Sequence, residues 1–408
     1  MHSSTWASLL LLGLAQLVPE ASARPSSCPP PKFKPGRAIY TLSNEEHNSV
    51  IALPIGSNGL LSKGTTTSTY GAGSNILVVK DNKKQLGAPD ALASQSALTI
   101  AGNHLFAINA GSNTVTMFAI DPLNPARLTM IGRPVSVPGD FPNTVAASAK
   151  NQLVCVGTSG ARSGVSCASF SSKGIGKMDQ LRPVGLKQTT PPVGPTSTIS
   201  QVFFSGDEET LFAAVKGNPA TNTTGVLGIF SVEEPCDGHA AVSVSENGKL
   251  TSVDGTIVLF GSSTIQGSSD LFVTDAAFGA AVLSVDVETG AATVKSKATI
   301  EGQKATCWVA ISPETNTAFV TDVALNRVVE LSLTDASIQS VTDLSANGDP
   351  GLIDLRAAGS FVYALSPGNG TTLPAVTVID ARSKKQVQHF QLKGLDASKN
   401  AQGMAILV

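Results

Sequence analysis

The stretch LFVTDAAFGAAVLSVDVETGAATV, residues 271–294, contains two apolar strands joined by a polar bend, then a turn and a third strand. A version of it returns at residue 318 as AFVTDVALNRVVELSLTDASIQSV. Runs of Val, Ile, Thr and Phe between Gly, Asn, Asp and Ser turns are typical of β-strands. The repetition therefore predicts a chain built from copies of one small β-sheet.

Seven such strand pairs follow one another along the chain. They begin at residues 38, 105, 153, 211, 271, 318 and 361. The average spacing is about 54 residues, close to the period of propeller blades with four strands. No stretch beyond the leader has a helical period of apolar residues over eleven or more positions. We predict an all-β, seven-bladed β-propeller; the alternative is an array of two-sheet sandwiches.

The first strand pair lacks the short apolar strand that precedes the other six. It is preceded by SCPPPKFKPGR, whose prolines cannot pair in a central strand. The last residues, 401–408, read AQGMAILV and have the pattern of the missing strand. We expect this C-terminal strand to pair with the first blade and close the ring, which hides edges that would otherwise invite aggregation.

The N-terminus has the features of an export signal. Residues 6–18 are apolar, and Ala21, Ser22 and Ala23 form a small-residue cleavage pattern. We expect a signal peptide over residues 1–23, a Pro-rich lead over 24–36 and the propeller over 37–408. No second apolar run approaches the ~20 residues of a membrane span. We expect a secreted protein and leave open whether it stays at the cell wall or surface.

Composition narrows the range of partners. The formal charge is −2, 14% of residues are charged and there is no long basic run, which argues against nucleic acid. Histidines are scattered, and no metal-binding or hydrolase motif is present, so we expect neither metal nor cofactor.

Export makes disulfides and glycans possible. All five cysteines lie beyond residue 23, and an odd number leaves at least one thiol unpaired or joined to another chain. Cys155 and Cys167 flank a predicted hairpin bend centred on Ala161 and would face each other, so they are our preferred pair; the alternative is two small buried residues. Asn222 and Asn369 begin N-glycosylation sequons, which predict exposed loops.

The seven-unit pattern, the segment SPETNTAFVTD, the turn SENGKL at residues 245–250 and the export signal resemble the secreted fungal relatives of the lactonase and 3-carboxymuconate cyclase propellers. Some of those relatives are cell-surface glycoprotein antigens. The resemblance covers most of the mature chain and implies the same fold and an extracellular role.

The catalytic residues of that cyclase family do not carry over to this chain. The family places a His, two Arg and a Glu around the mouth of the channel. The corresponding stretches here are Pro142-Asn143-Thr144, Gly194-Pro195-Thr196-Ser197, Val215-Lys216-Gly217 and Thr274-Asp275-Ala276. None supplies the family's residue, which argues against cyclase activity.

Four other residues are candidates for a rebuilt site. Lys216, at a bend, could hold a carboxylate. Asp275 and Asp322 occupy the same place in consecutive units and could bind a cation or share a proton. Arg327, with Arg162 at an equivalent bend, could grip an anion. The alternatives are solvated basic side chains and carboxylates that bond their own turns.

Two hypotheses about function remain. The first is a non-catalytic secreted glycoprotein that binds a host matrix protein or a wall component, as in adhesion. The second is an extracellular cycloisomerase or lactonase whose site is built from those four residues. We favour the binding protein, because the catalytic set is missing and the sequons fall among the bends of one propeller face.

Overall fold

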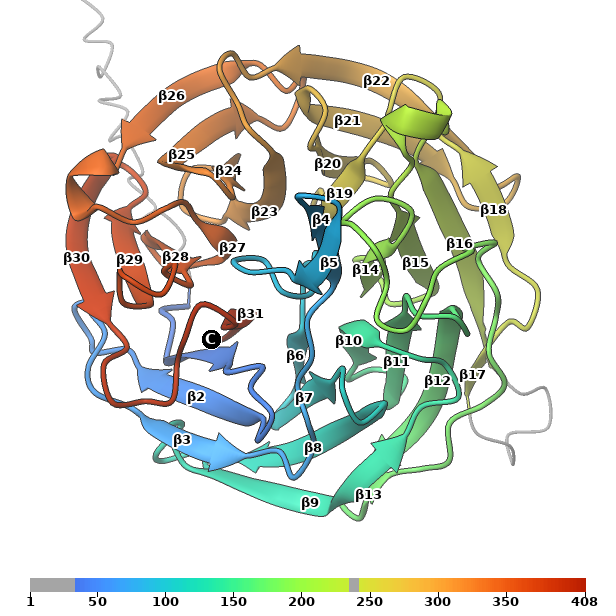
Figure 1. Ribbon diagram of the computed structural model, residues 1–408, viewed down its shortest axis with the longest axis horizontal. Coiled ribbons are helices and arrows are strands. Elements are labelled where there is room, and N and C mark those ends of the chain that lie inside the picture. The colour runs from blue at the N-terminus through green and yellow to red at the C-terminus, as the bar shows by residue number, and fades with distance from the viewer. Residues whose placement is uncertain (1–33, 235–241) are drawn as a thin grey trace, which may run out of the picture. The chain divides into compact units, whose positions relative to one another are not determined.

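The computed structural model describes residues 34–234 and 242–408, which form a seven-bladed β-propeller (Figure 1). The fold class predicted from the strand period is confirmed. The expected signal peptide and most of the Pro-rich lead lie outside the described residues. The first strand, β1, begins at Ala38.

The first four blades are antiparallel sheets, built from strands consecutive in sequence except in blade 1, which includes the last strand of the chain. Blade 1 has β1 (Ala38–Leu42), β2 (Ser49–Pro54), β3 (Thr65–Ser68) and β31 (Gln402–Leu407). Blade 2 has β6 (Leu98–Ala101), β7 (His104–Asn109), β8 (Thr114–Ile120) and β9 (Leu128–Ser136). Blade 3 has β10 (Pro142–Ser148), β11 (Leu153–Thr158), β12 (Gly164–Ser171) and β13 (Gly174–Ile175). Blade 4 has β14 (Ile199–Phe204), β15 (Thr210–Val215), β16 (Val226–Glu233), β17 (Ser243–Val244) and β18 (Lys249–Ser252).

The other three blades repeat this plan. Blade 5 has β19 (Leu259–Thr264), β20 (Leu271–Asp275), β21 (Gly279–Asp286) and β22 (Ala291–Thr299). Blade 6 has β23 (Thr306–Ser312), β24 (Thr317–Asp322), β25 (Leu325–Ser332) and β26 (Ile338–Asp343). Blade 7 has β27 (Ile353–Ala358), β28 (Phe361–Ser366), β29 (Ala375–Asp380) and β30 (Lys385–Gln391). Outside the blades lie the hairpin β4 (Leu77–Lys80) and β5 (Lys83–Leu86) and two 3-10 turns, η1 (Pro219–Thr221) and η2 (Ser345–Asn347).

The ring joins its two ends in blade 1, where β31 is the innermost strand. It pairs antiparallel with β1, so that Ile406 lies opposite Ile39 and Ala405 opposite Tyr40. The amide of Arg37 extends the pairing by donating to the carbonyl of Leu407 at 2.7 Å. Pairing between the first and last strands covers the inner edge of β1.

Burial follows the position of each strand in its blade. The second strands β11 and β15 are buried along their whole length, because the neighbouring blades cover both faces. Outer strands such as β22 alternate between exposed and buried residues. Apolar side chains of adjacent blades meet in several core clusters, and Trp308 and Tyr363 are among the largest fully buried side chains.

A disulfide joins Cys155 on β11 to Cys167 on β12, and the strand register places the two residues directly opposite each other. Cys307, on β23, is buried and has no disulfide partner within the described residues. Cys28 and Cys236 lie outside those residues.

Candidate functional site

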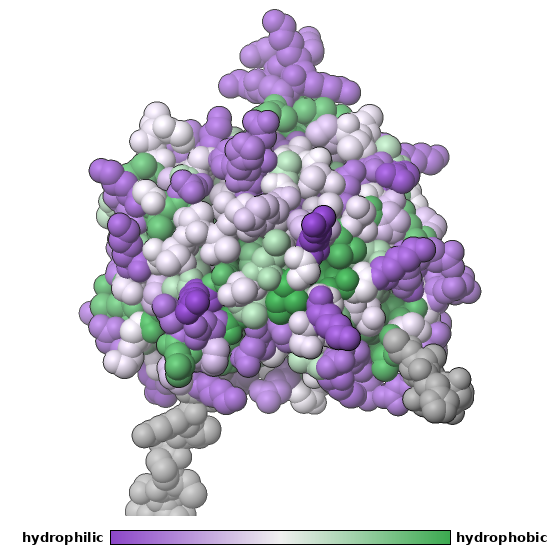
Figure 2. All heavy atoms as spheres, turned by 90° about the horizontal axis from the view of Figure 1, so that it is seen from below, coloured by the Kyte–Doolittle hydropathy of each residue, from purple (hydrophilic) through white to green (hydrophobic). Residues whose placement is uncertain are grey.

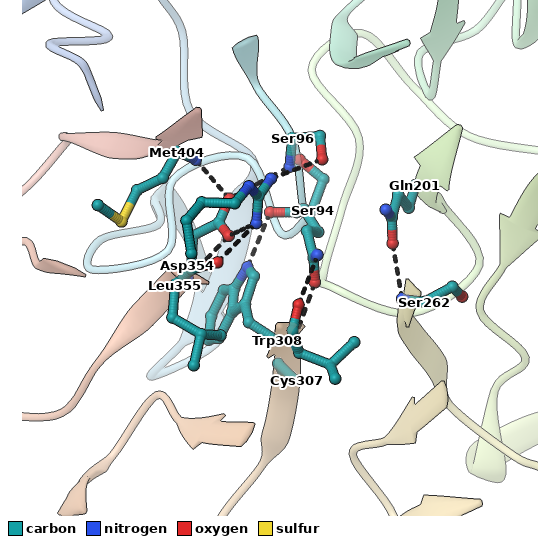
Figure 3. A network of polar contacts seen from close by, with 12 residues as sticks. Ser94, Ser96, Gln201, Ser262, Cys307, Trp308, Asp354, Leu355 and Met404 are labelled. Atoms are coloured by element: carbon teal, nitrogen blue, oxygen red, sulfur yellow. Dashed lines mark hydrogen bonds and ion pairs between the residues drawn. The ribbon is translucent and has the colours of Figure 1, made fainter. Parts of the chain in front are cut away.

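The central channel of the propeller is filled at one end by the chain itself. Residues 91–96, which we call the channel plug, precede β6 and lie where the inner strands converge (Figure 3). All six residues are buried. Ala93 and Ser96 have φ angles of 48° and 66°, so the plug is irregular rather than a strand.

Side chains and backbone of the plug form hydrogen bonds with the edges of the inner strands. The Gln95 amide pairs with the backbone of Val309, donating from Nε2 to the carbonyl at 3.0 Å and accepting from the N–H at 3.1 Å. The indole Nε1 of Trp308 donates to the carbonyl of Ser94 at 3.0 Å (Figure 3). The backbone N–H of Gln95 donates to the carbonyl of Ser200 on β14 at 2.8 Å. The plug therefore satisfies backbone groups that would otherwise be orphaned in the channel.

One glycine makes this close approach possible. A Cβ on Gly261 of β19 would lie 2.4 Å from Gln95 Oε1 and 2.6 Å from the carbonyl oxygen of Cys307. Any side chain at this position would displace the plug or the neighbouring blade.

Two charged residues of β27 hold the last residue of the plug. Asp354 is almost fully buried and accepts from the amides of Ser96 at 3.3 Å and Leu355 at 2.8 Å, and from that of Met404 (Figure 3). Arg356 pairs with Asp354 at 2.5 Å and donates to the hydroxyl of Ser96 at 2.9 Å. Burial raises the pKa of Asp354, and the charge of Arg356 opposes that rise. This pair was not anticipated from the sequence.

Lys216, the first candidate from the sequence, is buried rather than solvated. Its Nζ donates to the carbonyl of Ala93 in the plug and lies 4.5 Å from the centre of the Phe260 ring. Burial lowers the pKa of Lys216, while the charge of Asp90 opposes that change. Burial raises the pKa of Asp90, whose Oδ1 is enclosed and has no hydrogen-bond partner within the described residues.

Asp275 and Asp322 occupy equivalent places at the ends of β20 and β24, as the sequence suggested. Asp275 accepts from the backbone amides of Ile257 at 2.7 Å, Val258 at 3.0 Å and Ala277 at 2.9 Å. Burial raises the pKa of Asp275, and these three bonds oppose the rise.

Asp322 repeats the arrangement in the next blade. It accepts from the amides of Lys304 at 2.7 Å, Ala305 at 3.2 Å and Ala324 at 2.9 Å. Each carboxylate thus ties its own turn to the segment that leads into its blade.

Arg327 lies farther out, on β25. Its Nη2 donates to the carbonyl of Glu301 at 3.1 Å. Arg162 forms an ion pair with Asp140 at 2.7 Å and is largely exposed.

The charges of three of the four candidates act on the pKa of one buried group, the thiol of Cys307. Burial raises the pKa of this thiol, the negative charges of Asp90, Asp322 and Asp275 raise it further, and Lys216 opposes them. Arg327 does not contribute. Nζ of Lys216 and both carboxylates form hydrogen bonds with backbone groups of this chain. Within the described residues no group of three or more His, Cys, Asp or Glu could hold a metal ion.

Both sequons lie on exposed bends. Asn222 follows η1 with a φ of 54°, and Asn369 accepts from the amide of Thr371 at 3.0 Å. Attachment of glycans at these positions remains a prediction. No helix in the described part of the chain is long and apolar enough to cross a membrane.

Comparison with known proteins supports the fold class. No protein-family model and no curated protein matches the chain. Among solved structures, the periplasmic gluconolactonase of Pseudomonas aeruginosa is similar with a TM-score of 0.61 and 12% identity, covering 91% of this chain and 99% of that one. A protein from Lactobacillus plantarum has a TM-score of 0.59 at 13% identity, with coverage of 91% and 99%.

A candidate 6-phosphogluconolactonase from Bacteroides fragilis is also similar, with a TM-score of 0.56, 11% identity and coverage of 91% and 98%. At these identities the likeness concerns the fold alone. The chain has the fold of lactonase-like seven-bladed propellers, with one end of its channel filled by its own residues.

Proposed function

We propose that the chain is a non-catalytic binding protein of the propeller class, which is exported and glycosylated and contacts its partner through the plugged face. The observation that carries this proposal is the channel plug together with the hairpin above it. A catalytic group must reach hydrogen-bond distance of a substrate. The polar atoms of Lys216, Asp275 and Asp322 are instead engaged with backbone of this chain.

The β4–β5 hairpin offers a protruding surface on this face. Its register pairs Leu77 with Leu86 and Val79 with Lys84, so these four side chains lie on one side of the ribbon. Val79 is 60% exposed and Leu86 is 65% exposed. In Figure 1 the hairpin lies in front of the ring, and in Figure 2 a hydrophilic projection with apolar atoms at its base stands above the upturned face. An exposed apolar pair on a projecting element favours a binding role.

The base of the hairpin is anchored, so its position is defined. Leu77 forms a parallel bridge with Val193, its amide donates to the carbonyl of Pro192 at 2.8 Å, and its carbonyl accepts from Gly194 at 2.6 Å. The free end carries Lys80, Lys83 and Lys84, with one acidic residue, Asp81, at the tip. The surface therefore suits a partner with apolar and acidic groups, such as an extracellular matrix protein or a wall component.

The alternative function is an extracellular cycloisomerase or lactonase with a rearranged site. It draws on the names of the structural neighbours and on three ionisable side chains, Lys216, Asp275 and Asp322, whose charges act on the pKa of Cys307. This function requires the plug to be displaced, because Nζ of Lys216 donates a hydrogen bond to the carbonyl of Ala93 in the plug.

The binding role is tested by replacing both exposed apolar residues, in V79S/L86S. Binding to immobilised matrix proteins and wall polysaccharides is measured by surface plasmon resonance, with Val387→Ser as the control, because Val387 is 45% exposed on the outer strand β30. We expect the double variant to lose binding at least tenfold and the control to retain it. Equal binding by all three proteins would refute the role of this face.

The enzymatic alternative is tested separately with 3-carboxymuconate and gluconolactone as substrates. We expect no turnover above that of heat-inactivated protein. Turnover that Lys216→Met abolishes, in a variant that still unfolds cooperatively, would replace the binding proposal with a rebuilt catalytic site.

A further inference from the structure

Below the plug the central channel is open, and this space is separate from the plugged face. A cavity of about 290 Å³, which we call the lower chamber, is bounded by Gln95 of the plug, by Gln201, Phe203 and Phe204 of β14, by Val309 of β23 and by Arg356 of β27. Its size is near the lower end of small-molecule sites.

The lower chamber connects with the protein surface. A neighbouring space of about 240 Å³ shares Phe203 and Phe204 and extends to Ser205 and Gly206, in the turn after β14. Because β14 begins beside the plug, where Ser200 accepts from Gln95, its other end and this turn lie away from the plug. A third space, of about 150 Å³, adjoins on the other side and shares Arg356. Arg356 thus borders two adjoining spaces, and its side chain is partly exposed.

Arg356 has hydrogen-bond donors left over. The side chain has five N–H groups. Both N–H groups of Nη1 donate hydrogen bonds, one to Asp354 and one to the carbonyl of Leu355, and one N–H group of Nη2 donates to the hydroxyl of Ser96. The Nε–H and one Nη2–H have no acceptor within the described residues. The side chain is 18% exposed. Guanidinium donors of this kind bind carboxylates and phosphates.

The negative charge of Asp354 does not depend on Arg356 alone. Three backbone amides also donate to this carboxylate, from Ser96, Leu355 and Met404. The other acidic residue near the chamber, Glu208, accepts from the amide of Lys150 at 3.0 Å and from the hydroxyl of Ser148. Both carboxylates thus accept hydrogen bonds from other groups, and two N–H groups of Arg356 remain available to an anion.

The opposite wall adds a second donor. Gln201 is 4% exposed, and its Oε1 accepts from the amide of Ser262 at 2.7 Å. Its Nε2 makes no hydrogen bond within residues 34–234 and 242–408. In Figure 3 this amide lies across from the network of Ser94, Trp308 and Asp354. This amide group lines the cavity, so its N–H groups are available to a ligand with an acceptor group.

The remaining walls combine apolar side chains with the polar residues Ser262, Ser263 and Thr264 of β19. Phe203, Phe204, Val309 and Ile311 line the chamber. Inorganic anions would leave these surfaces in contact with water, whereas an organic body would cover them. The two phenylalanine side chains therefore favour an anion whose body is apolar on their side of the chamber.

We propose that the lower chamber binds a small organic carboxylate. The carboxylate lies against the free N–H groups of Arg356 and Nε2 of Gln201, and its apolar body packs against Phe203 and Phe204. This site uses the opposite end of the channel from the plugged face and is independent of the partner proposed above.

Benzoate is a suitable probe, and benzamide is its neutral counterpart. Binding to the purified full-length protein is measured by isothermal titration calorimetry, with Arg356→Lys as the test variant. Lysine keeps the charge but loses the planar fork of donors. Arg133→Lys, at an exposed position on the outer strand β9, is the matched control.

We expect saturable one-to-one binding of benzoate, binding of benzamide at least tenfold weaker, and at least a tenfold loss in R356K with no change in R133K. Thermal unfolding of each free variant establishes that it is folded. Phe204→Ala provides a second test that leaves Arg356 in place, and we expect a several-fold loss.

Four outcomes would overturn the proposal: no saturable binding of benzoate at millimolar concentration, equal binding of benzamide, unchanged binding by R356K, or phosphate binding as tightly as benzoate. The V79S/L86S variant should bind benzoate normally, so failure here is distinguishable from failure of the binding role.

Discussion

At the residue scale, Asp275 shows how one position admits two interpretations. A carboxylate at the end of a strand in two consecutive blades suggested a site, and the sequence also allowed a turn-bonding role. In the structure Asp275 is fully buried and accepts three backbone amides. Its oxygen atoms are therefore engaged, and its contribution is to stability.

We expect Asp275→Ala to lower the free energy of unfolding by roughly 2–4 kcal/mol, because three buried N–H groups lose a charged acceptor. Urea unfolding measures the change. Asp286→Ala is the control, since Asp286 accepts from Glu288 and Thr289 in an exposed turn, where water can replace it. A loss no larger than that of the control would contradict the structural role.

Asp90 gives a second prediction at the residue scale, which concerns the dependence of stability on pH. Burial raises the pKa of Asp90 above its ordinary value of about 3.9. A carboxyl group whose folded pKa is raised binds more protons in the folded state than in the unfolded state. Stability therefore falls as the pH rises from about 4 toward neutrality.

Asp90→Asn removes this titrating carboxyl group while keeping the side-chain size. Between pH 4.5 and pH 7.5 we expect the unmodified protein to lose stability relative to D90N. The unfolding free energy of D90N minus that of the unmodified protein should increase by about 1 kcal/mol or more. Urea unfolding across that range measures it. Parallel profiles for the two proteins would show that Asp90 does not titrate as described.

At the scale of elements, the plug is held by pairings between residues far apart in sequence. Gln95 binds Val309, which is 214 residues away. No local pattern in residues 88–98, APDALASQSAL, predicts this; its small residues merely lack the alternation of the neighbouring strands. The plug nevertheless decides what the mouth of the channel can do.

Gln95→Ala tests the plug directly. We expect a loss of roughly 2–4 kcal/mol in the free energy of unfolding, because the N–H and C=O of Val309 lose their partners in a buried site. Hydrogen exchange at the Val309 amide should accelerate. Gln339→Ala, at an exposed residue of β26 that bonds only Ser337, should change neither quantity. Unchanged exchange at Val309 in Q95A would show that the plug does not protect this edge.

At the scale of the whole molecule, the ring depends on its last strand. β31 pairs with β1 in blade 1, and its residue Gly403 accepts from the amide of Ala97 next to the plug at 3.1 Å. The C-terminal strand thus joins both the first blade and the segment that leads from the plug into the second.

We expect deletion of residues 402–408 to expose the edge of β1 and to produce self-association, seen by size-exclusion chromatography, together with a lower urea midpoint. Deletion of Val408 alone, which is 52% exposed, is the control and should leave both unchanged. A monomeric protein with an unchanged midpoint after the longer deletion would contradict the role of this strand.

The sequence by itself determined the features that repeat or are local. The strand period specified seven blades, and the symmetric bend around Ala161 pointed to the Cys155–Cys167 pair, because side chains opposite each other in a hairpin follow from register. Blade number and strand order needed no knowledge of distant contacts.

The tertiary structure alone decided which polar groups are free. Lys216, Asp275 and Asp322 each form hydrogen bonds with backbone, while Arg356 and Gln201 retain donors at a cavity. Whether a buried polar atom is satisfied depends on backbone groups brought to it from other blades. Those contacts arise only when the ring is closed, so no periodicity in the sequence can predict them.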